Sequence, residues 1–197
     1  QKLNTSDKIC FDTETTSVDA NNCELVGMSF SIKPHEAYYI PVSANQEEAK
    51  KLVHQFKPLL ENKQITKIGQ NIKFDQLVLK WYDIDVQGVL FDTMLAHYLI
   101  DADTKHNMNV LSENYLGYSP VSITELIGKK GANQGTMRDV PVDQIKEYAA
   151  EDADVTLQLF NVFKKDIDQT HLHKLFYEVE TPLIPVLTEM EYEGVKI

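Results

Sequence analysis

Two acidic residues, Asp12 and Glu14, follow the first apolar run of the chain, Ile9-Cys10-Phe11. The run is typical of a β-strand, in which residues two apart point to the same face. The spacing therefore places two carboxylates side by side at the end of a strand, where they repel each other. A hard divalent cation such as Mg²⁺ or Mn²⁺, which prefers oxygen ligands, would relieve this repulsion. A pair of solvated acids in a turn is the alternative interpretation.

A third carboxylate, Asp75, ends the stretch Gly69-Gln70-Asn71-Ile72-Lys73-Phe74-Asp75. The stretch joins a short expected strand to an expected helix, and in open α/β sheets ligands gather at such junctions. Asn71 suits either a helix N-cap or a ligand contact. Asp75 taken alone suits an exposed carboxylate that the helix dipole favours. The stretch therefore becomes informative only together with the other acids.

A tyrosine and a fourth carboxylate, Tyr148 and Asp152, are four residues apart in a long expected helix. Residues at this spacing share one face of a helix and lie roughly 6 Å apart along its axis. One small region can therefore hold both side chains. Glu151 and Asp154 point elsewhere, and we expect them to be solvated. An acidic patch on an amphipathic helix, with Tyr148 half buried, is the alternative interpretation.

The elements that must position these residues follow from apolar periodicity and from turn and cap residues. The first three strands are expected to form an antiparallel start, and the later strands alternate with helices, which predicts one mixed sheet flanked by helices. The segment 116–141 carries a glycine-rich run and is expected to be a mobile surface loop. The expected strands span residues 9–14, 25–32, 37–42, 66–69 and 89–91, and the expected helices span 47–60, 71–82, 92–100, 109–115, 142–168 and 175–192.

The composition of the 197 residues, 43% hydrophobic and 25% charged, is that of an ordinary globular protein with one good core. No apolar run reaches the length of a membrane span. The two cysteines, Cys10 and Cys23, lack metal-ligand spacing and suit a reducing cytoplasm. The net charge of −11 argues against long-range attraction to nucleic acid. It does not exclude a nucleic-acid enzyme, because bound cations offset the charge of a carboxylate-rich site.

Three stretches taken together resemble the motifs of a known enzyme family. Residues 11–15 (Phe-Asp-Thr-Glu-Thr), 69–75 and 148–154 (Tyr-Ala-Ala-Glu-Asp-Ala-Asp) are similar, in order and spacing, to the three motifs of the DEDD-type 3′→5′ exonucleases. A tyrosine four residues before the last aspartate is typical of the tyrosine subclass. The resemblance is strongest to the proofreading domain of bacterial DNA polymerase I. It extends over nearly the whole chain, including Phe91-Asp92-Thr93 and the tail from Pro182 to Ile197.

The resemblance implies an α/β fold of the ribonuclease H-like type, a five-stranded mixed sheet flanked by helices on both faces. It also implies an exonuclease domain over residues 1–174 and a helix at 175–197 that leads into a polymerase region absent from this chain. The domain would then act on the 3′ end of single-stranded DNA, beside the polymerase domain of the same full-length protein. It would work in the bacterial cytoplasm, without a membrane, and the isolated domain is expected to be a monomer.

The resemblance further implies that four carboxylates hold two divalent cations, Mg²⁺ or Mn²⁺, an arrangement that clamps the attacking and leaving oxygens of a phosphoryl displacement. Asp12 would bridge both cations, and Glu14 and Asp152 would complete the first site. Asp75 would hold the second cation, partly through water. Tyr148 would orient the attacking water, and nucleoside 5′-monophosphates would be the products.

The family's contacts with the 3′ end match a further set of positions in this chain. Phe74 in that set is also a natural core residue. Each contact also suits a plain surface residue, and for Lys105 that interpretation is equally good. Asp92 lies at a strand-to-helix junction and is expected to be an N-cap rather than a metal ligand. The implied substrate contacts are Thr13, Val18, Gln70, Asn71, Phe74, Lys105 and His106.

Two other functions remain open from the sequence. An RNA-trimming or RecQ-associated exonuclease would share the tyrosine subclass and the fold, although the polymerase-like tail argues against it. A catalytically silent exonuclease domain, kept as a structural spacer under a polymerase, would suit the acidic chain. The presence of Asp12, Glu14, Asp75, Tyr148 and Asp152 argues against a silent domain.

Overall fold

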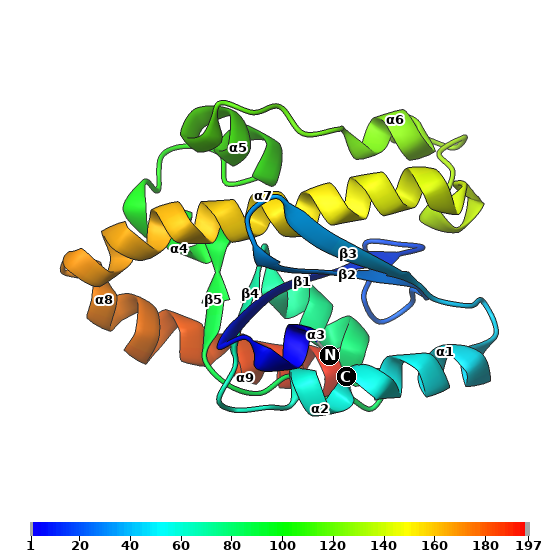
Figure 1. Cartoon of the computed structure of the whole chain (residues 1–197), viewed down its shortest axis with the longest axis horizontal. Helices are drawn as coiled ribbons and strands as arrows, with labels where there is room; N and C mark the ends of the chain where they lie inside the picture. Colours follow the sequence, from blue (N-terminus) through cyan, green and yellow to red (C-terminus); the bar gives the residue numbers. More distant parts are fainter. Residues whose placement is uncertain (1, 196–197) are drawn as a thin grey trace.

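The computed structural model describes residues 2–195, whose elements form one mixed sheet with helices around it (Figure 1). The strands are β1 (Lys8–Thr15), β2 (Leu25–Lys33), β3 (Glu36–Pro41), β4 (Thr66–Gly69) and β5 (Leu90–Asp92). The α-helices are α1 (Gln46–Val53), α2 (Lys57–Leu60), α3 (Ile72–Lys80), α4 (Thr93–Ile100), α5 (Met108–Leu116), α6 (Ile123–Ile127), α7 (Val142–Gln169), α8 (Leu172–Leu175) and α9 (Thr181–Glu193). Shorter helical turns are η1 (Lys2–Thr5), η2 (His54–Phe56), η3 (Met137–Asp139) and η4 (Phe176–Glu180).

The five-stranded sheet has the order β3-β2-β1-β4-β5. β1 pairs antiparallel with β2, and β2 pairs antiparallel with β3. β4 pairs parallel with β1 on one side and with β5 on the other. The expected mixed sheet with an antiparallel start is therefore confirmed, and β1 lies at its centre.

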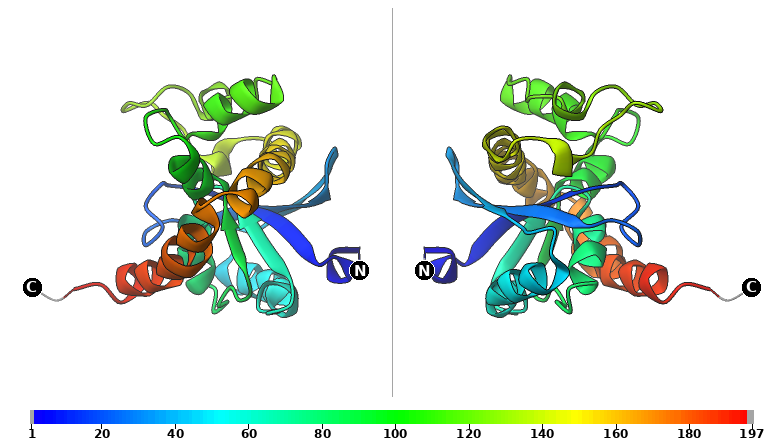
Figure 2. Two further views of the ribbon diagram at one scale, coloured as in Figure 1. Left: turned by 90° about the vertical axis from the view of Figure 1, so that its left-hand side faces the viewer. Right: turned by 90° about the vertical axis from the view of Figure 1, so that its right-hand side faces the viewer.

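Alternation along β1 divides the core between the two faces of the sheet. Ile9 and Phe11 are buried in a cluster with apolar residues of α1, α2 and α3. Cys10, which points the other way, is buried in a second cluster with Ile68 and residues of α4, α5 and α7. Figures 1 and 2 show the long helix α7 on one face of the sheet and α3 and α9 on the opposite face. The residues that follow in β1 must therefore also be shared between an α7 side and an α3 side.

The expected helix over 47–60 is interrupted in the structure. The structure has α1, a 3-10 turn (η2) and then α2, which begins at Lys57 and carries Pro58 in its first turn. A proline has no backbone N–H to donate, so it is tolerated in the first turn of a helix but not in its interior. Pro58, which could have kinked the end of the expected helix, therefore lies in the first turn of a new one.

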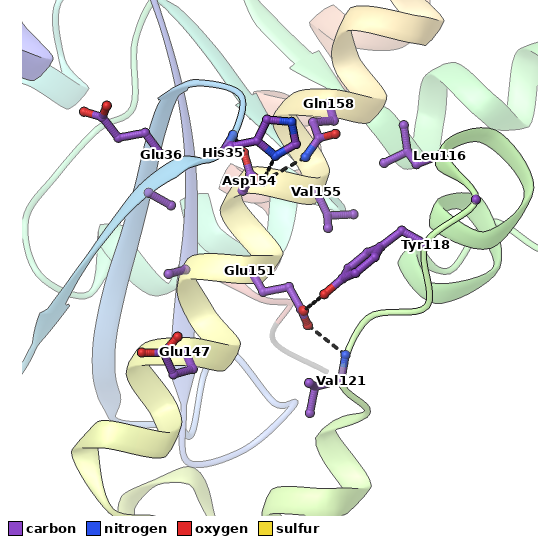
Figure 3. Close-up of a pocket in the computed structure, with 13 residues that line it drawn as sticks. His35, Glu36, Leu116, Tyr118, Val121, Glu147, Glu151, Asp154, Val155 and Gln158 are labelled. Carbon is purple, nitrogen blue, oxygen red and sulfur yellow. Dashed lines mark hydrogen bonds and ion pairs between the residues drawn. The ribbon is translucent and has the colours of Figure 1, made fainter.

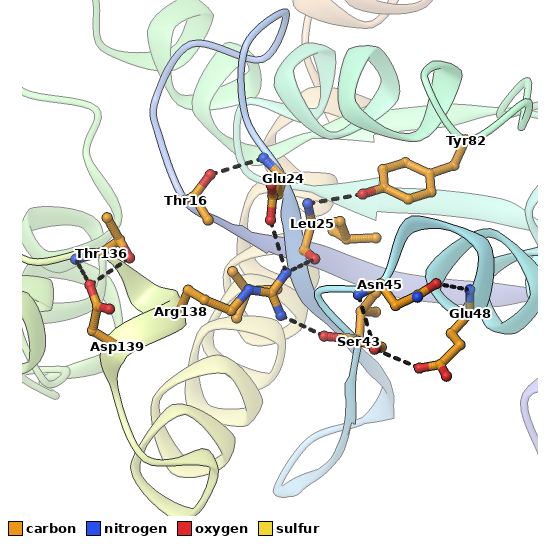
Figure 4. Close-up of polar contacts among 12 residues, drawn as sticks. Thr16, Glu24, Leu25, Ser43, Asn45, Glu48, Tyr82, Thr136, Arg138 and Asp139 are labelled. Atoms are coloured by element: carbon orange, nitrogen blue, oxygen red, sulfur yellow. Dashed lines mark hydrogen bonds and ion pairs between the residues drawn. The ribbon is translucent and has the colours of Figure 1, made fainter.

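The segment 116–141 is more structured than the expected loop, because it contains α6 and η3. Arg138 attaches the end of this segment to the strands (Figure 4): its guanidinium donates to the carbonyl oxygens of Val42 at 2.6 Å and Leu25 at 2.7 Å. Glu24 forms an ion pair with the same group at 3.8 Å. These bonds place the start of α7 against β2.

The expected helix over 175–192 is present as α8, a π-helical turn (η4) and α9. α9 packs against α3, where the Thr188 hydroxyl donates to the Gln76 side chain at 3.1 Å. Lys73 and Lys80 of α3 form ion pairs with Glu191 and Glu189 of α9. Among the described residues, no helix combines the length and the apolar character that crossing a bilayer requires.

Candidate active site

Three carboxylates meet between the end of β1 and the middle of α7. Asp12 and Glu14 lie on the same side of β1 as Cys10, which is the side that α7 covers. Asp152 approaches from α7, and one carboxylate oxygen from each of the three residues lies within 4.8 Å of the others. The i, i+2 spacing in a strand and the position of one helix thus bring acids 140 residues apart in sequence into one cluster.

The three carboxylates are poorly solvated, and among the described residues two of their oxygens have no hydrogen-bond partner. Glu14 is 5% exposed and Asp152 is 6% exposed. Glu14 Oε1 and Asp152 Oδ1 are the buried oxygens without a partner. Burial is the main cause that raises the pKa of Asp12 to about 7, although the residue as a whole is not fully buried. Burial and then the charge of Asp12 raise the pKa values of Glu14 and Asp152 well above their usual range.

Asp75 lies in the first turns of α3 and reaches the same strand from its other side. Thr13 points away from α7, and its backbone N–H and its hydroxyl donate to Asp75 Oδ1 at 3.0 and 2.6 Å. Burial and the charge of Asp12 raise the pKa of the Asp75 carboxyl well above its usual range. Asp75 is thus buried and electrostatically coupled to Asp12, not the exposed carboxylate that its helix position alone suggested. Both hydrogen-bond donors of Thr13, an expected substrate contact, are thus engaged by Asp75.

Tyr148 lies one helical turn before Asp152 and shares its face of α7. A hydrogen bond between the two side chains lowers the pKa of Asp152, against the larger effect of burial. Burial first, and then the charges of Asp152, Glu14 and Asp12, raise the pKa of the Tyr148 phenol far above its usual range. The phenol therefore keeps its proton at neutral pH and can donate a hydrogen bond beside the carboxylates.

These residues fit a divalent cation. The donor set consists of carboxylate oxygens alone, which is the preference of hard cations such as Mg²⁺. Two buried oxygens lack partners among the described residues, and buried polar atoms normally have them. After burial, the charge of Asp12 raises the pKa values of Glu14 and Asp152, and positive charge between the three carboxylates would offset this repulsion.

Asn71 occupies the N-cap position of α3 but does not cap it. Its backbone is in the left-handed region (φ 59°, ψ 47°), and its side chain makes no cap hydrogen bond. Asp92, at the end of β5, accepts hydrogen bonds instead from the N–H groups of Asn71 (3.1 Å) and Ile72 (2.9 Å). The same carboxylate caps α4 through the N–H groups of Met94 and Leu95. The N-cap interpretation of Asn71 is therefore wrong, whereas that of Asp92 is confirmed.

Three of the expected substrate contacts line one cavity of about 250 Å³ next to β1. Val18 is 95% exposed in the loop after β1, at the open edge of this cavity. Asn71 and Phe74 line the cavity from the start of α3. Phe74 is only partly buried against the core, so it belongs to the core and to the cavity wall at once.

Two further expected contacts, Gln70 and His106, lie beside α4. The Gln70 side chain donates from Nε2 to the backbone carbonyl of His106 at 2.8 Å, and its Oε1 accepts from the Thr93 hydroxyl. His106 is half-buried, whereas its neighbour Lys105 is exposed. Gln70 and His106 are thus connected, and Thr93 is a neighbour that the sequence analysis did not single out.

Glu151 and Asp154 point away from the carboxylate cluster, as expected, but they are not simply solvated. Figure 3 shows both on the outer side of α7, where they line a cavity of about 780 Å³. Glu151 accepts from the Tyr118 hydroxyl and from Val121 N–H at 2.7 Å. Asp154 accepts from His35 N–H at 2.6 Å. These acids attach the loop after α5 and the β2–β3 turn to α7, which helical periodicity could not indicate.

Tyr39 is a further neighbour of the cluster that the sequence analysis missed. Its ring lies directly over Gly27, where an added Cβ would come within 2.2 Å of the hydroxyl oxygen. Gly27 pairs with Glu14 across β1 and β2. Burial and the charge of Glu14 raise the pKa of Tyr39 to about 12. A glycine inside a strand is a sequence signal for such close approach, although it does not name the partner.

Comparisons with known proteins agree with this geometry. A family model described as 3′-5′ exonuclease matches residues 1–168. DNA polymerase I of Pseudomonas aeruginosa is 38% identical over 98% of this chain, and that of Borreliella burgdorferi is 36% identical over 99% of it. The chain spans about a fifth of the length of these relatives, 22% and 21% respectively.

Solved structures share the fold. The chain superposes on Brucella melitensis NrnC with bound Mg²⁺ with a TM-score of 0.75 and 23% identity, covering 96% of this chain and 87% of the other. It superposes on the POL domain of Pol1 from M. smegmatis in complex with DNA primer-template and dNTP with a TM-score of 0.74 and 16% identity, covering 100% of this chain and 30% of the other. The sheet and helices are thus those of ribonuclease H-like exonucleases, and the chain belongs to the family of 3′→5′ exonuclease domains found in DNA polymerase I proteins.

Proposed function

We propose that this chain uses two divalent cations, Mg²⁺ or Mn²⁺, to remove nucleoside 5′-monophosphates from the 3′ ends of DNA. We further propose that it does so as the proofreading domain of a DNA polymerase in the bacterial cytoplasm. The observation that carries the proposal is the cluster of Asp12, Glu14 and Asp152, whose oxygens lie within 4.8 Å of one another and include two buried oxygens without partners among the described residues. Asp75 accepts hydrogen bonds from Thr13, the residue between Asp12 and Glu14, and its pKa is raised by burial and by the charge of Asp12.

We assign each acid a role that its position allows. Asp12, Glu14 and Asp152 would hold one cation, and Asp12 with Asp75 would hold the other. Such cations, when bound, lower the pKa of a water molecule and offset the charge that develops on the scissile phosphate. Thr13 fixes one oxygen of Asp75 with two hydrogen bonds, so that the other oxygen is presented away from Thr13.

Tyr148 would orient the attacking water rather than deprotonate it. Burial and three carboxylates raise the pKa of its phenol, so the side chain stays neutral at physiological pH. A neutral phenol can donate one hydrogen bond and accept another, which suffices to position a water beside Asp152. It cannot serve as a general base, because that role requires a pKa near the working pH.

The cavity lined by Val18, Asn71 and Phe74 would take the terminal nucleoside. Val18 and the Phe74 ring supply apolar contacts, and nucleotide bases stack favourably on aromatic side chains. The Asn71 amide makes no cap hydrogen bond and can meet a polar atom of the sugar or the phosphate. Binding would then depend on local contacts and cations, because the chain as a whole carries a net charge of −11.

Two candidate functions, digestion of DNA and trimming of RNA, differ in their substrate. Relatives named DNA polymerase I are 36–38% identical to this chain, which favours DNA. One structure with a similar fold, Brucella melitensis NrnC, is described as bound to pGG, and it is 24% identical. RNA trimming is therefore the second candidate, carried by fold alone.

Digestion of matched single strands tests the proposal. We would compare a 5′-labelled DNA 12-mer with an RNA 12-mer of the same sequence, with Mg²⁺ or with EDTA, and with wild-type or Asp12→Ala protein. We expect a Mg²⁺-dependent ladder that shortens from the 3′ end of DNA and is absent with Asp12→Ala. Trimming of RNA alone would assign the RNA function. No cleavage of either strand at high protein concentration would support a silent structural domain.

We also propose that α9 connects the exonuclease domain (1–174) to a polymerase region and that its outer face docks against that region. A stripe of exposed apolar residues supports this: Leu175, Val179, Leu183, Val186, Leu187 and Met190. Four of them, from Leu183 to Met190, lie in α9 away from its buried residues Thr181, Ile184 and Thr188, and Leu175 and Val179 precede them in α8 and η4. The polymerase region is the proposed occupant because the curated relatives are DNA polymerase I proteins about five times as long as this chain.

Sedimentation tests this assignment. If the stripe serves a polymerase region, we expect this chain alone to be a monomer at micromolar concentration and to remain one after Leu187→Glu. A dimer that dissociates in the Leu187→Glu variant would assign the stripe to a second copy of the chain instead.

A further inference from the structure

A line of hydrogen bonds runs from the core behind α4 to the Gln70 side chain. The Tyr115 hydroxyl of α5 lies 3.0 Å from His97 Nε2. The Nδ1 atoms of His97 and His106 lie 2.8 Å apart. The backbone carbonyl of the same His106 then accepts from Gln70 Nε2 at 2.8 Å. Three contacts thus connect a tyrosine of α5 to a residue expected at the 3′ end.

His97 is an unusual residue for its position. It is 1% exposed and packs against the rings of Phe163 and Tyr115, where an apolar side chain would avoid the desolvation of two ring nitrogens. Both nitrogens are instead hydrogen-bonded, one toward α5 and one toward the loop that carries His106. Nothing in the cation site or the nucleoside cavity uses this histidine.

The contacts of Gln70 determine the orientation of its side-chain amide. A backbone carbonyl can only accept, so the amide nitrogen must face His106. The amide oxygen then faces the Thr93 hydroxyl, whose one hydrogen can be donated to it or to the Gly69 carbonyl. The second hydrogen on Nε2 is left as a donor. Without the His106 carbonyl, the amide could rotate by half a turn and present an acceptor instead.

The His97–His106 contact requires a proton on one of the two facing nitrogens and none on the other. Two Nδ1 atoms at 2.8 Å form a hydrogen bond only when one of them carries a proton and the other does not. If His97 donates, its Nε2 is bare and accepts from the Tyr115 hydroxyl; if His106 donates, His97 Nε2 carries a proton and donates to Tyr115. In both states the three side chains are paired, and the loop at 106 is held against α4.

We propose that His97 is a positioning residue for the 3′ end of the substrate. Its hydrogen bond to the His106 ring fixes the position of the His106 backbone carbonyl. That carbonyl in turn fixes the orientation of the Gln70 amide, so that the amide nitrogen, and not the amide oxygen, can meet an acceptor on the terminal nucleotide. This inference rests on the proposed function, because it assumes that Gln70 meets the 3′ end. The natural acceptors there are phosphate and sugar oxygens.

Two substitutions of His97 separate positioning from packing. His97→Asn places an amide nitrogen close to the position of Nδ1 and can still donate to His106, but it loses the Tyr115 contact. His97→Gln places its amide nitrogen close to the position of Nε2 and keeps the Tyr115 contact, but it loses His106. Both remove a buried ring, so a purely structural role predicts similar effects of the two variants on stability and on activity.

We expect His97→Gln to raise the KM for a single-stranded DNA 12-mer about tenfold, as the loss of one hydrogen bond would. The kcat should stay within about twofold, because the cation site is untouched. His97→Asn should keep a KM close to that of the wild type. In a Gln70→Ala background, His97→Gln should add no further increase, because the group it positions is gone.

Three results would overturn the inference. The two variants could change KM equally, the His97→Gln effect could persist in full in the Gln70→Ala background, or Gln70→Ala alone could leave KM unchanged while the wild type digests DNA. In all three, the exonuclease function would stand. A wild-type protein that digests no DNA would remove the proposed function and this inference together.

The contact between His97 and His106 can also be tested in the wild-type protein by NMR, which does not depend on the variants folding. Long-range ¹H–¹⁵N NMR spectra distinguish protonated from bare imidazole nitrogens. We expect one protonated and one bare Nδ1 in the pair of His97 and His106 near neutral pH. Two rings that each carry their proton only on Nε2 would break the connection and contradict the inference.

Discussion

The buried carboxylates make this chain less stable when it lacks cations, and Asp12→Asn should reverse part of that effect. Burial raises the pKa of Asp12 from 3.8 to about 7 in the folded protein. The folded state therefore binds more protons than the unfolded state between about pH 4 and pH 7. By linkage, the free energy of unfolding falls as pH rises through that window.

The size of this change in the free energy of unfolding can be calculated from the shift in the pKa of Asp12. One pKa unit corresponds to about 1.4 kcal/mol, so a shift from 3.8 to about 7 sets an upper bound of ~4 kcal/mol at pH 8. Asp12 is partly open to solvent, and its neighbours share the protons, which reduces the effect of this one group. We expect Asp12→Asn to stabilise the cation-free protein by ~2 kcal/mol at pH 8. For a chain of this length that is roughly 4–8 °C in melting temperature.

Thermal unfolding in EDTA at pH 5 and pH 8 provides the assay. The wild type should melt at a higher temperature at pH 5 than at pH 8, and Asp12→Asn should reduce this difference. Asp103→Asn is the matched control, because Asp103 is exposed and lies outside the cluster. Adding Mg²⁺ at pH 8 should stabilise the wild type and not Asp12→Asn. A wild type that is equally stable at both pH values, or a variant less stable than the wild type at pH 8, would refute the reasoning.

Three further predictions concern single side chains. Tyr148→Phe should lower kcat for DNA roughly tenfold or more with little change in KM, because the phenol orients water without binding the strand; an unchanged kcat in steady-state kinetics would contradict that role. Asn71→Gly should keep the left-handed backbone and the melting temperature but raise KM about fivefold, whereas Asn71→Ala should also cost ~1 kcal/mol of stability; equal KM values for Asn71→Gly and wild type would remove Asn71 from the binding site. Lys67 is fully buried, and its ammonium donates to the carbonyls of Asn62, Ile65 and Gln87, so Lys67→Met should cost ~2–4 kcal/mol in urea unfolding. The exposed Lys63→Met is its control, and similar losses for both variants would contradict the prediction.

The sequence predicted those features that depend on regular periodicity. Alternation in a strand placed Asp12 and Glu14 on one side of β1, and the four-residue spacing in a helix placed Tyr148 and Asp152 on one side of α7. The sheet type followed from the order of strands and helices. The meeting of β1 with α7 came from the family resemblance, since periodicity does not tell which helix covers which strand.

Features that depend on contacts between distant segments could not be predicted in the same way. Asp92 was expected to cap its own helix, α4, but its bonds to the start of α3 require β4 and β5 to be neighbours in the sheet. Asn71, one of the two donors in that second cap, has a left-handed backbone that periodicity does not indicate. Arg138 and the His97–His106 pair likewise join elements whose proximity only the folded chain defines.

Two-cation binding by acids from three elements is the central claim, and the stoichiometry of Mn²⁺ binding tests it most directly. We would titrate the protein with Mn²⁺ in the presence of a nucleoside 5′-monophosphate and count bound ions by electron paramagnetic resonance. The wild type should bind two ions per chain, Asp75→Asn should bind one, and Asp12→Asn should bind neither tightly. One ion in both the wild type and Asp75→Asn, or two ions in Asp12→Asn, would contradict the account.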